Sequence, residues 1–203
     1  MRRSTVILLA LLVAAASGCS GNKSRATDAL RNQQAAHADM AEAQAKARQL
    51  AVQAERAASE GKVDAAIDLY RQALNTWSRL PQAYNNLGIL LRAKGDDQSA
   101  AEAFSIAAEQ DLTDARPFYN LGGVYLDKGW PKRASEYFQL SLERDPNYLP
   151  SLRGAIRAAD LLFVADDRTM EYIERAIMME RDPEWTAYIS RQRYRVEQQI
   201  DRK

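Results

Sequence analysis

Three glycines recur at a fixed interval in the middle of the chain: Gly129 lies as far beyond Gly95 as Gly95 lies beyond Gly61. We call this interval the repeat length. An aromatic residue stands nine positions after each glycine, and small residues stand five and twelve positions after it. A period of about 34 residues is typical of repeated helix pairs, each of which buries its apolar face only against its neighbours. The spacing therefore predicts an all-α protein built as a helix-turn-helix solenoid.

The residue types at the repeated positions suit closely packed helix pairs. The aromatic residues Tyr70, Phe104 and Phe138 supply large apolar area between helices. The repeated glycines fall between two helical patterns, where a residue with positive φ can end the first helix. A second set of small residues lacks bulk where the first helix of each pair must approach the second closely. These residues are Ala54, Gly88 and Gly122.

The segments AYNNLGILLRAKGDDQSAAEAFSIAA and PFYNLGGVYLDKGWPKRASEYFQLSLERDP resemble tetratricopeptide repeats (TPRs). The resemblance implies three TPR units at 47–80, 81–114 and 115–148, followed by a degenerate TPR-like helix pair at 149–182. Asp182 is a candidate N-cap and Pro183 suits the first position of a helix. We therefore expect residues 183–203 to form a C-terminal capping helix, with Trp185, Ile189, Val196 and Ile200 on one face.

The TPR resemblance also implies a concave groove, lined by the first helix of each unit, that binds protein or peptide partners. Amides can bond a peptide backbone, arginine can pair with a carboxylate, and tyrosine can anchor a contact. The alternative is that Asn86 and Asn120 only satisfy the repeat consensus. The expected groove residues are Gln82, Asn85, Asn86, Ile89 and Arg92 in the second unit, Arg116, Tyr119, Asn120, Gly123 and Leu126 in the third, and Arg153 and Arg157 in the degenerate pair.

Chaperone-binding TPR proteins hold a terminal carboxylate with a Lys/Asn clamp on successive first helices. This chain has Ala51 and Glu55 where that clamp begins, so the sequence argues against a chaperone co-factor.

The N-terminus follows a different pattern. Arg2 and Arg3 precede an apolar run at 6–16, and small residues lead to Cys19, the only cysteine. This layout is typical of a secretory signal peptide. An uncut membrane anchor is the competing interpretation, but a helix that spans a membrane needs about 20 apolar residues, more than the run at 6–16 provides. Ordinary cleavage would leave Cys19 as an unpaired thiol. The sequence ASGC at 16–19 instead resembles a bacterial lipobox, which implies a signal peptide at 1–18 and a lipidated Cys19.

The lipobox resemblance implies a place in the bacterial cell envelope, and Ser20 after the cysteine favours the outer membrane, facing the periplasm. Residues 19–26 are small and polar, which predicts a flexible tether. Residues 27–46 are rich in Ala and Gln but poor in large apolar groups, which predicts a helical stalk with little to bury. His37 lies in this stalk and is expected to be solvated.

No residue pattern indicates catalysis, a metal site or a cofactor. The sequence has one histidine and no glycine-rich phosphate loop, and its net charge of +1 argues against a nucleic-acid partner. The acidic pairs Asp96–Asp97 and Asp166–Asp167 are expected to cap helices, and Met178 and Met179 to lie in the core. We therefore expect no enzyme activity.

The sequence thus predicts a membrane-anchored TPR scaffold or adaptor that assists assembly of a cell-envelope complex, such as a pilus or a secretion system. Two alternatives stay open: a self-associating structural lipoprotein, which makes a homo-oligomer possible, and a regulator of a peptidoglycan enzyme.

Overall fold

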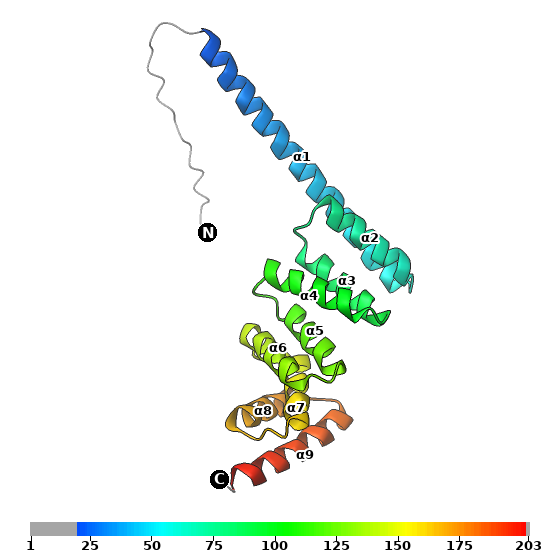
Figure 1. The fold of residues 1–203 in the computed structure, drawn as a ribbon, viewed down its shortest axis with the longest axis vertical. Helices are drawn as coiled ribbons and strands as arrows, with labels where there is room; N and C mark the ends of the chain where they lie inside the picture. The colour runs from blue at the N-terminus through cyan, green and yellow to red at the C-terminus, as the bar shows by residue number, and fades with distance from the viewer. Residues whose placement is uncertain (1–19, 202–203) are drawn as a thin grey trace. The chain divides into compact units, whose positions relative to one another are not determined.

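The computed structural model describes the backbone of residues 20–201 and side chains from residue 28 onward. The signal segment 1–18 and Cys19, the expected lipidation site, lie outside these residues. The described part consists of helices joined by short turns and contains no strand, which confirms the all-α prediction (Figure 1). The helices are α1 (Ser20–Ser59), α2 (Val63–Thr76), α3 (Pro81–Ala93), α4 (Asp97–Gln110), α5 (Ala115–Asp127), α6 (Pro131–Arg144), α7 (Leu149–Leu161), α8 (Asp167–Met179) and α9 (Pro183–Ile200).

The chain divides into two compact units, Met1–Glu42 and Ala43–Lys203. In the first unit, helix α1 already begins at Ser20, so residues 20–26 are helical and not the expected tether. The physical reason is that Lys23, Arg25 and Ala26 are good helix formers directly adjoining a long Ala-rich helix, and extending a helix costs far less than nucleating one. Residues 28–42, His37 among them, are exposed.

In the second unit the first helices α3, α5, α7 and α9 begin one repeat length apart, at Pro81, Ala115, Leu149 and Pro183. Helix α9 therefore stands where the first helix of a further unit would begin. Its Ile189 and Val196 are fully buried and join the apolar core formed with helices α6–α8. A second core cluster joins helices α2–α5 with Ala54 of α1.

Glycines end the first helix in three units, with φ of +75° at Gly61, +82° at Gly95 and +74° at Gly129. At Gly95 the amide donates to the carbonyl of Arg92, and the next amide donates to that of Leu91, which is the Schellman arrangement. The fourth unit has the same two bonds at Phe163, one repeat length after Gly129, although Phe163 is not glycine. Phe163 keeps a positive φ of 55° and is 81% exposed.

The other small residues provide room for the aromatic rings, as predicted. A Cβ atom added at Gly88 would lie 2.6 Å from the ring of Phe104, and one at Gly122 would lie 2.6 Å from the ring of Phe138. The ring of Phe138 also faces Gly154 on the next first helix, where an added Cβ would lie 2.5 Å away. At Gly88, Gly122 and Gly154 the close approach of the aromatic ring to the helix therefore depends on glycine.

The acidic pairs cap helices, as expected. The Asp96 carboxylate accepts from the Ser99 amide at 3.1 Å, and that of Asp166 accepts from the Thr169 amide at 2.8 Å. Asp182 caps α9 in the same way.

The expectation for the methionine pair was wrong in part. Met179 packs on the core, but Met178 is 74% exposed. The buried side of α8 runs through Thr169, Ile173 and Ala176, and Met178 lies off that stripe.

Candidate partner-binding face

The helices α3, α5, α7 and α9 lie in a row along the second unit: α3 contacts α5, α5 contacts α7, and α7 contacts α9. We call the side that these helices form, together with α1 from Ala43 onward, the first-helix face. It carries the residues that the sequence assigned to a groove.

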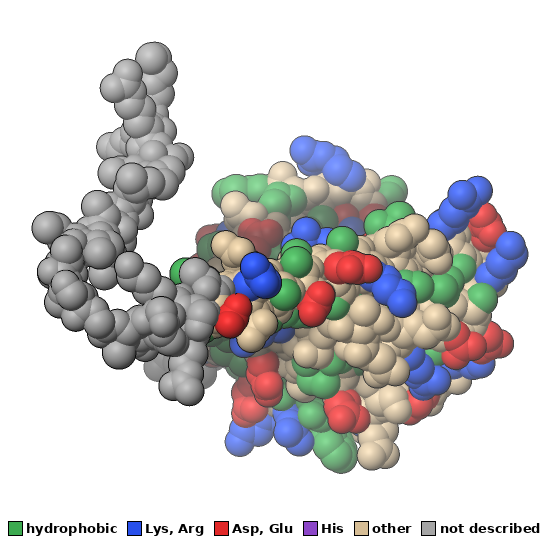
Figure 2. All heavy atoms as spheres, turned by 90° about the horizontal axis from the view of Figure 1, so that it is seen from above, with side chains coloured by type: hydrophobic (Ala, Val, Ile, Leu, Met, Phe, Trp, Pro, Cys, Tyr) green, Lys and Arg blue, Asp and Glu red, His purple; other side chains and the backbone are tan. Residues whose placement is uncertain are grey.

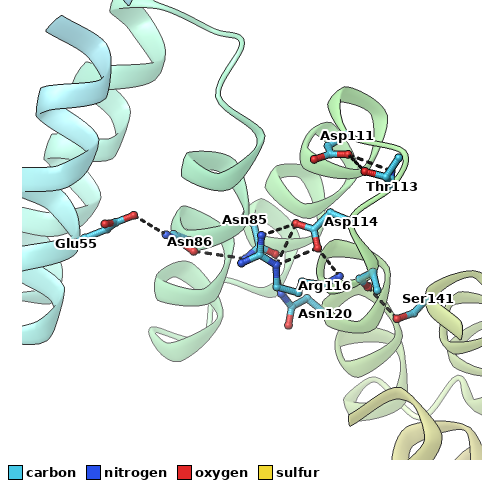
Figure 3. A network of polar contacts seen from close by, with 10 residues as sticks. Glu55, Asn85, Asn86, Asp111, Thr113, Asp114, Arg116, Asn120 and Ser141 are labelled. Carbon is cyan, nitrogen blue, oxygen red and sulfur yellow. Dashed lines mark hydrogen bonds and ion pairs between the residues drawn. The ribbon is translucent and has the colours of Figure 1, made fainter. Parts of the chain in front are cut away.

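The three asparagines of the expected groove form a row of polar contacts across this face (Figure 3). The Asn120 amide donates to the Asn85 carbonyl oxygen at 2.8 Å, and both residues are buried. The Asn86 amide donates to the Tyr70 hydroxyl at 3.2 Å and to the Glu55 carboxylate at 3.4 Å. The buried asparagines therefore join neighbouring first helices, whereas half-buried Asn86 stays within reach of a partner.

Three of the four expected groove arginines already pair with carboxylates of this chain. Arg92 pairs with Asp127, and Arg116 makes a two-bond contact with Asp114, the N-cap of its own helix (Figure 3). Arg153 makes a two-bond contact with Glu180, at 2.7 and 2.6 Å. These side chains are held in place by internal acids and are not open clamps for a partner's carboxylate.

Glu180 is the most enclosed acid of the site, with a side chain only 1% exposed. Besides Arg153, the amides of Arg181 and Asp182 donate to it at 2.9 Å. These hydrogen bonds, that of Arg153 first, outweigh burial and hold the pKa of the Glu180 carboxyl below its usual value of 4.5. The acid is therefore charged at neutral pH and ties α7 to the start of α9.

The remaining groove residues differ in exposure. Tyr119 is half-buried, with its ring centroid 5.6 Å from that of Tyr148 and 6.1 Å from that of Phe138. It is thus mostly a packing residue. Gly123 leaves room for the Arg92 guanidinium, and Leu126 is half-buried on the apolar core. The exposed members, besides the paired Arg116, are Gln82, Ile89 and Arg157.

Two pockets open on the first-helix face. The first, of about 200 Å³, lies between α1, α2 and α3 and is lined by Glu55, Ala58, Tyr70, Asn86, Ile89 and Leu90. The second, of about 390 Å³, lies between α7 and α9 and is lined by Arg157, Asp160, Leu161, Glu184, Trp185 and Tyr188. Of the expected groove residues, the structure places Asn86, Ile89 and Arg157 at pockets.

The walls of the second pocket are fixed by internal contacts. The Trp185 and Tyr188 rings meet edge to face, with centroids 5.5 Å apart, and the Arg153 guanidinium lies 4.8 Å from the Trp185 ring. The Tyr188 hydroxyl donates to Asp160 at 3.0 Å. Burial, and then this bond to an acid, raise the pKa of Tyr188 far above its usual value, so the phenol stays protonated.

The α9 residues of this pocket are not among the groove residues expected from the sequence. The available signal was the position of Pro183, which lies one repeat length after the start of α7. That spacing gives α9 the register of a first helix, and Glu184 and Tyr188 then occupy the repeat positions of Gln82 and Asn86.

Several other features bear on what this surface can do. Between residues 28 and 201 no group of acids, histidines and cysteines is arranged as a metal site. Among the helices that the structure describes, none is long and apolar enough to cross a membrane. Basic and acidic side chains are interspersed on the face drawn in Figure 2, without a large area of one sign.

Comparison with known proteins identifies the repeat. A family model described as tetratricopeptide repeat matches residues 115–148. Human protein O-mannosyl-transferase TMTC3 is 34% identical over 92 residues, which are 45% of this chain and 10% of that protein. The probable UDP-N-acetylglucosamine–peptide N-acetylglucosaminyltransferase SPINDLY of Solanum lycopersicum is 32% identical over 93 residues, 46% of this chain and 10% of that protein. The chain spans about a tenth of the length of these curated relatives.

Solved structures share the fold. MamA superposes with a TM-score of 0.59 at 20% identity, over 66% of this chain and 72% of that one. The first TPR of Spaghetti (RPAP3), bound to the HSP90 peptide SRMEEVD, gives 0.56 at 18% identity, over 59% and 94%. The Yersinia enterocolitica type III secretion chaperone SycD, in complex with a peptide of the translocator YopD, gives 0.50 at 21%, over 57% and 88%. These likenesses show that the chain has the TPR solenoid fold.

Proposed function

We propose that this TPR protein is a scaffold that binds an extended protein or peptide segment along its first-helix face. One observation carries the proposal: both pockets described above open on that face, one between α1, α2 and α3 and the other between α7 and α9. Specific binding needs apolar pockets with a few fixed polar groups, and both pockets combine aromatic walls with such groups. The peptides bound by Spaghetti and SycD support this use of the fold.

The geometry also favours an internal segment over a terminal carboxylate in the middle of the face. Arg92 and Arg116 are already paired with acids, and Glu55 contributes a negative charge beside Asn86. A carboxylate placed beside Asn86 would meet the negative charge of Glu55, and the two arginines of this part of the face are already paired. This agrees with the absence of a Lys/Asn clamp in the sequence.

We further propose, from the lipobox resemblance alone, that Cys19 is lipidated and holds the scaffold at a bacterial envelope membrane, where it assists assembly of a complex such as a pilus or secretion system. Two or more acyl chains would anchor it stably, since each buried CH₂ contributes about 0.8 kcal/mol. The proposal assigns no catalysis to the chain. Self-association and regulation of a peptidoglycan enzyme are the alternatives.

Photo-crosslinking in cells tests the binding role. A photoreactive residue replacing Ile89, which is 46% exposed at the first pocket, should capture a defined partner. The matched control replaces Leu112, which is 65% exposed in the α4–α5 connection. Crosslinking to the same partner should be lost when Asn86→Lys is added to the Ile89 probe, because the larger charged side chain fills the pocket.

Equal capture from both positions, or capture unaffected by Asn86→Lys, would show that the partner binds elsewhere. Repeating the experiment with Cys19→Ser tests the anchor at the same time. Acyl labelling and membrane association should then disappear, while capture in cell extracts persists. A labelled, membrane-bound Cys19→Ser protein would contradict the lipobox interpretation.

A further inference from the structure

The α7–α9 end of the first-helix face differs in charge from its middle. Arg157 on α7 and Arg191 on α9 lie one repeat length apart, at the repeat position that Ile89 and Gly123 occupy in the earlier units. Arg157 lines the second pocket, and the Arg191 guanidinium lies 6.0 Å from the ring centroid of Tyr188. Both side chains are exposed, and neither forms an ion pair with a carboxylate within the described part of the chain.

The acids near this pocket do not neutralise the two arginines. Asp160 accepts from Tyr188 and lies 3.6 Å from Arg195, so it is already engaged. Glu180 is bound by Arg153 inside the protein. Glu184 is the remaining acid of the pocket lining, and it lies in the first turn of α9, where the helix dipole favours a negative charge. Arg157 in the pocket lining and Arg191 beside Tyr188 are therefore two cations without an ion pair among the described residues, and Glu184 is the one lining acid without such a partner.

The apolar part of the pocket lining is formed by Leu161, Trp185 and the Tyr188 ring. Trp185 is held by the Tyr188 edge and the Arg153 guanidinium, and Leu161 is 53% exposed beside them. A volume of about 390 Å³ is large enough for one large side chain. Contacts that hold Trp185 before a partner binds reduce the entropy lost in ordering it, which favours a specific contact.

From this arrangement we infer that the α7–α9 pocket binds an acidic segment of a partner protein, with one large apolar side chain in the pocket and carboxylates on Arg157 and Arg191. This inference rests on the proposed function, because it names the chemistry of the segment that the first-helix face receives. It places the carboxylate-binding groups of the groove on α7 and α9, beyond the three units recognised first in the sequence.

A synthetic peptide tests the inference directly. The probe is a fluorescent, end-blocked Asp-Glu-Phe-Glu-Asp peptide, titrated with the full chain and followed by anisotropy. Arg157→Glu with Arg191→Glu should weaken binding by about tenfold or more, since both cations become like charges. Arg71→Glu with Arg79→Glu is the matched control: it makes the same change in net charge at exposed arginines outside the pocket, and binding should change by less than about twofold.

Two peptide variants separate the charge from the apolar contact. Replacing the phenylalanine with serine should weaken binding while the carboxylates remain, and an end-blocked Lys-Lys-Phe-Lys-Lys peptide should not bind. The inference is overturned if the acidic peptide does not bind, if the lysine peptide binds as well, or if both arginine pairs have equal effects. Crosslinking through Ile89 reports on the proposed function separately, since that probe lies at the other pocket.

Discussion

At the scale of single residues, Phe163 shows how the repeat tolerates an exception. Its backbone makes the same two hydrogen bonds as the glycines that end the earlier first helices. Its φ of 55° is one that residues other than glycine adopt only at a cost in free energy. The ring is 81% exposed, so little packing compensates for that strain. The neighbouring Leu161 is also exposed, which extends the apolar surface beside the α7–α9 pocket.

The variant Phe163→Gly should therefore stabilise the protein. Removing the left-handed strain gains about 1–2 kcal/mol, and the greater freedom of glycine in the unfolded chain takes back about 0.5–1 kcal/mol. We expect a net gain of about 0.5–1 kcal/mol in the free energy of unfolding, measured by urea unfolding followed by circular dichroism. Gly129→Ala, at the equivalent corner, is the control and should lose stability; a loss of stability in Phe163→Gly would show that the exposed ring makes a stabilising contact.

At the scale of elements, Glu180 makes helix α9 part of the solenoid. Its carboxylate accepts from Arg153 on α7 and from the two amides that lead into α9, and Arg153 in turn covers Trp185. Since a buried charge is tolerated only when its hydrogen bonds are complete, this acid fixes the α8–α9 connection. The pocket walls of the proposed acidic-segment site depend on the same junction.

The variant Glu180→Gln tests this junction. The pKa of Glu180 is lowered in the folded state, so the acid stabilises the fold above its unfolded pKa, and that stabilisation is lost as pH falls below about 4.5 and through the folded pKa. Glu180→Gln should cost about 1–3 kcal/mol at pH 7. The variant should also lose less stability than the natural protein when the pH is lowered, because it lacks the Glu180 carboxyl. Urea unfolding at several pH values measures both effects; an unchanged pH profile would mean that other carboxyls dominate.

The sequence predicted most of the elements because repeated positions constrain one another. The glycine corners, the aromatic rings and the N-caps at Asp96 and Asp182 could all be identified from spacing. The partners of the groove arginines could not. Asp127 and Asp114 can be seen in the sequence, but whether Arg92 or Arg116 reaches them depends on side-chain conformations that a repeat pattern does not specify. The sequence therefore pointed to Arg157, but only the structure shows that Arg157 and Arg191 form no ion pair among the described residues.

At the scale of the whole second unit, the apolar core consists of two clusters, one of which joins helices α1–α5 and the other α6–α9. Each helix pair packs mainly against its sequence neighbours, so stability is expected to be close to a sum of local terms. Phe138 lies at the junction, with its ring against Gly122 of α5 and Gly154 of α7. A change at this ring should therefore affect the adjoining helices first.

The variant Gly154→Ala tests both the packing and its range. The new Cβ would lie 2.5 Å from the Phe138 ring, which is 1% exposed and confined on its other side by Gly122, so the ring cannot move away. Overpacking of this kind costs about 1–3 kcal/mol, against a gain of at most about 1 kcal/mol from the better helix propensity of alanine. Gly123→Ala is the control, because its Cβ meets only the end of the Arg92 side chain.

The range of the effect can be measured by amide hydrogen exchange in the Gly154→Ala variant. Exchange should quicken in α6–α9 and remain nearly unchanged in α2–α4, because the solenoid can open at one end while the other stays folded. Equal loss of protection in all helices would show instead that the two core clusters unfold as one cooperative unit.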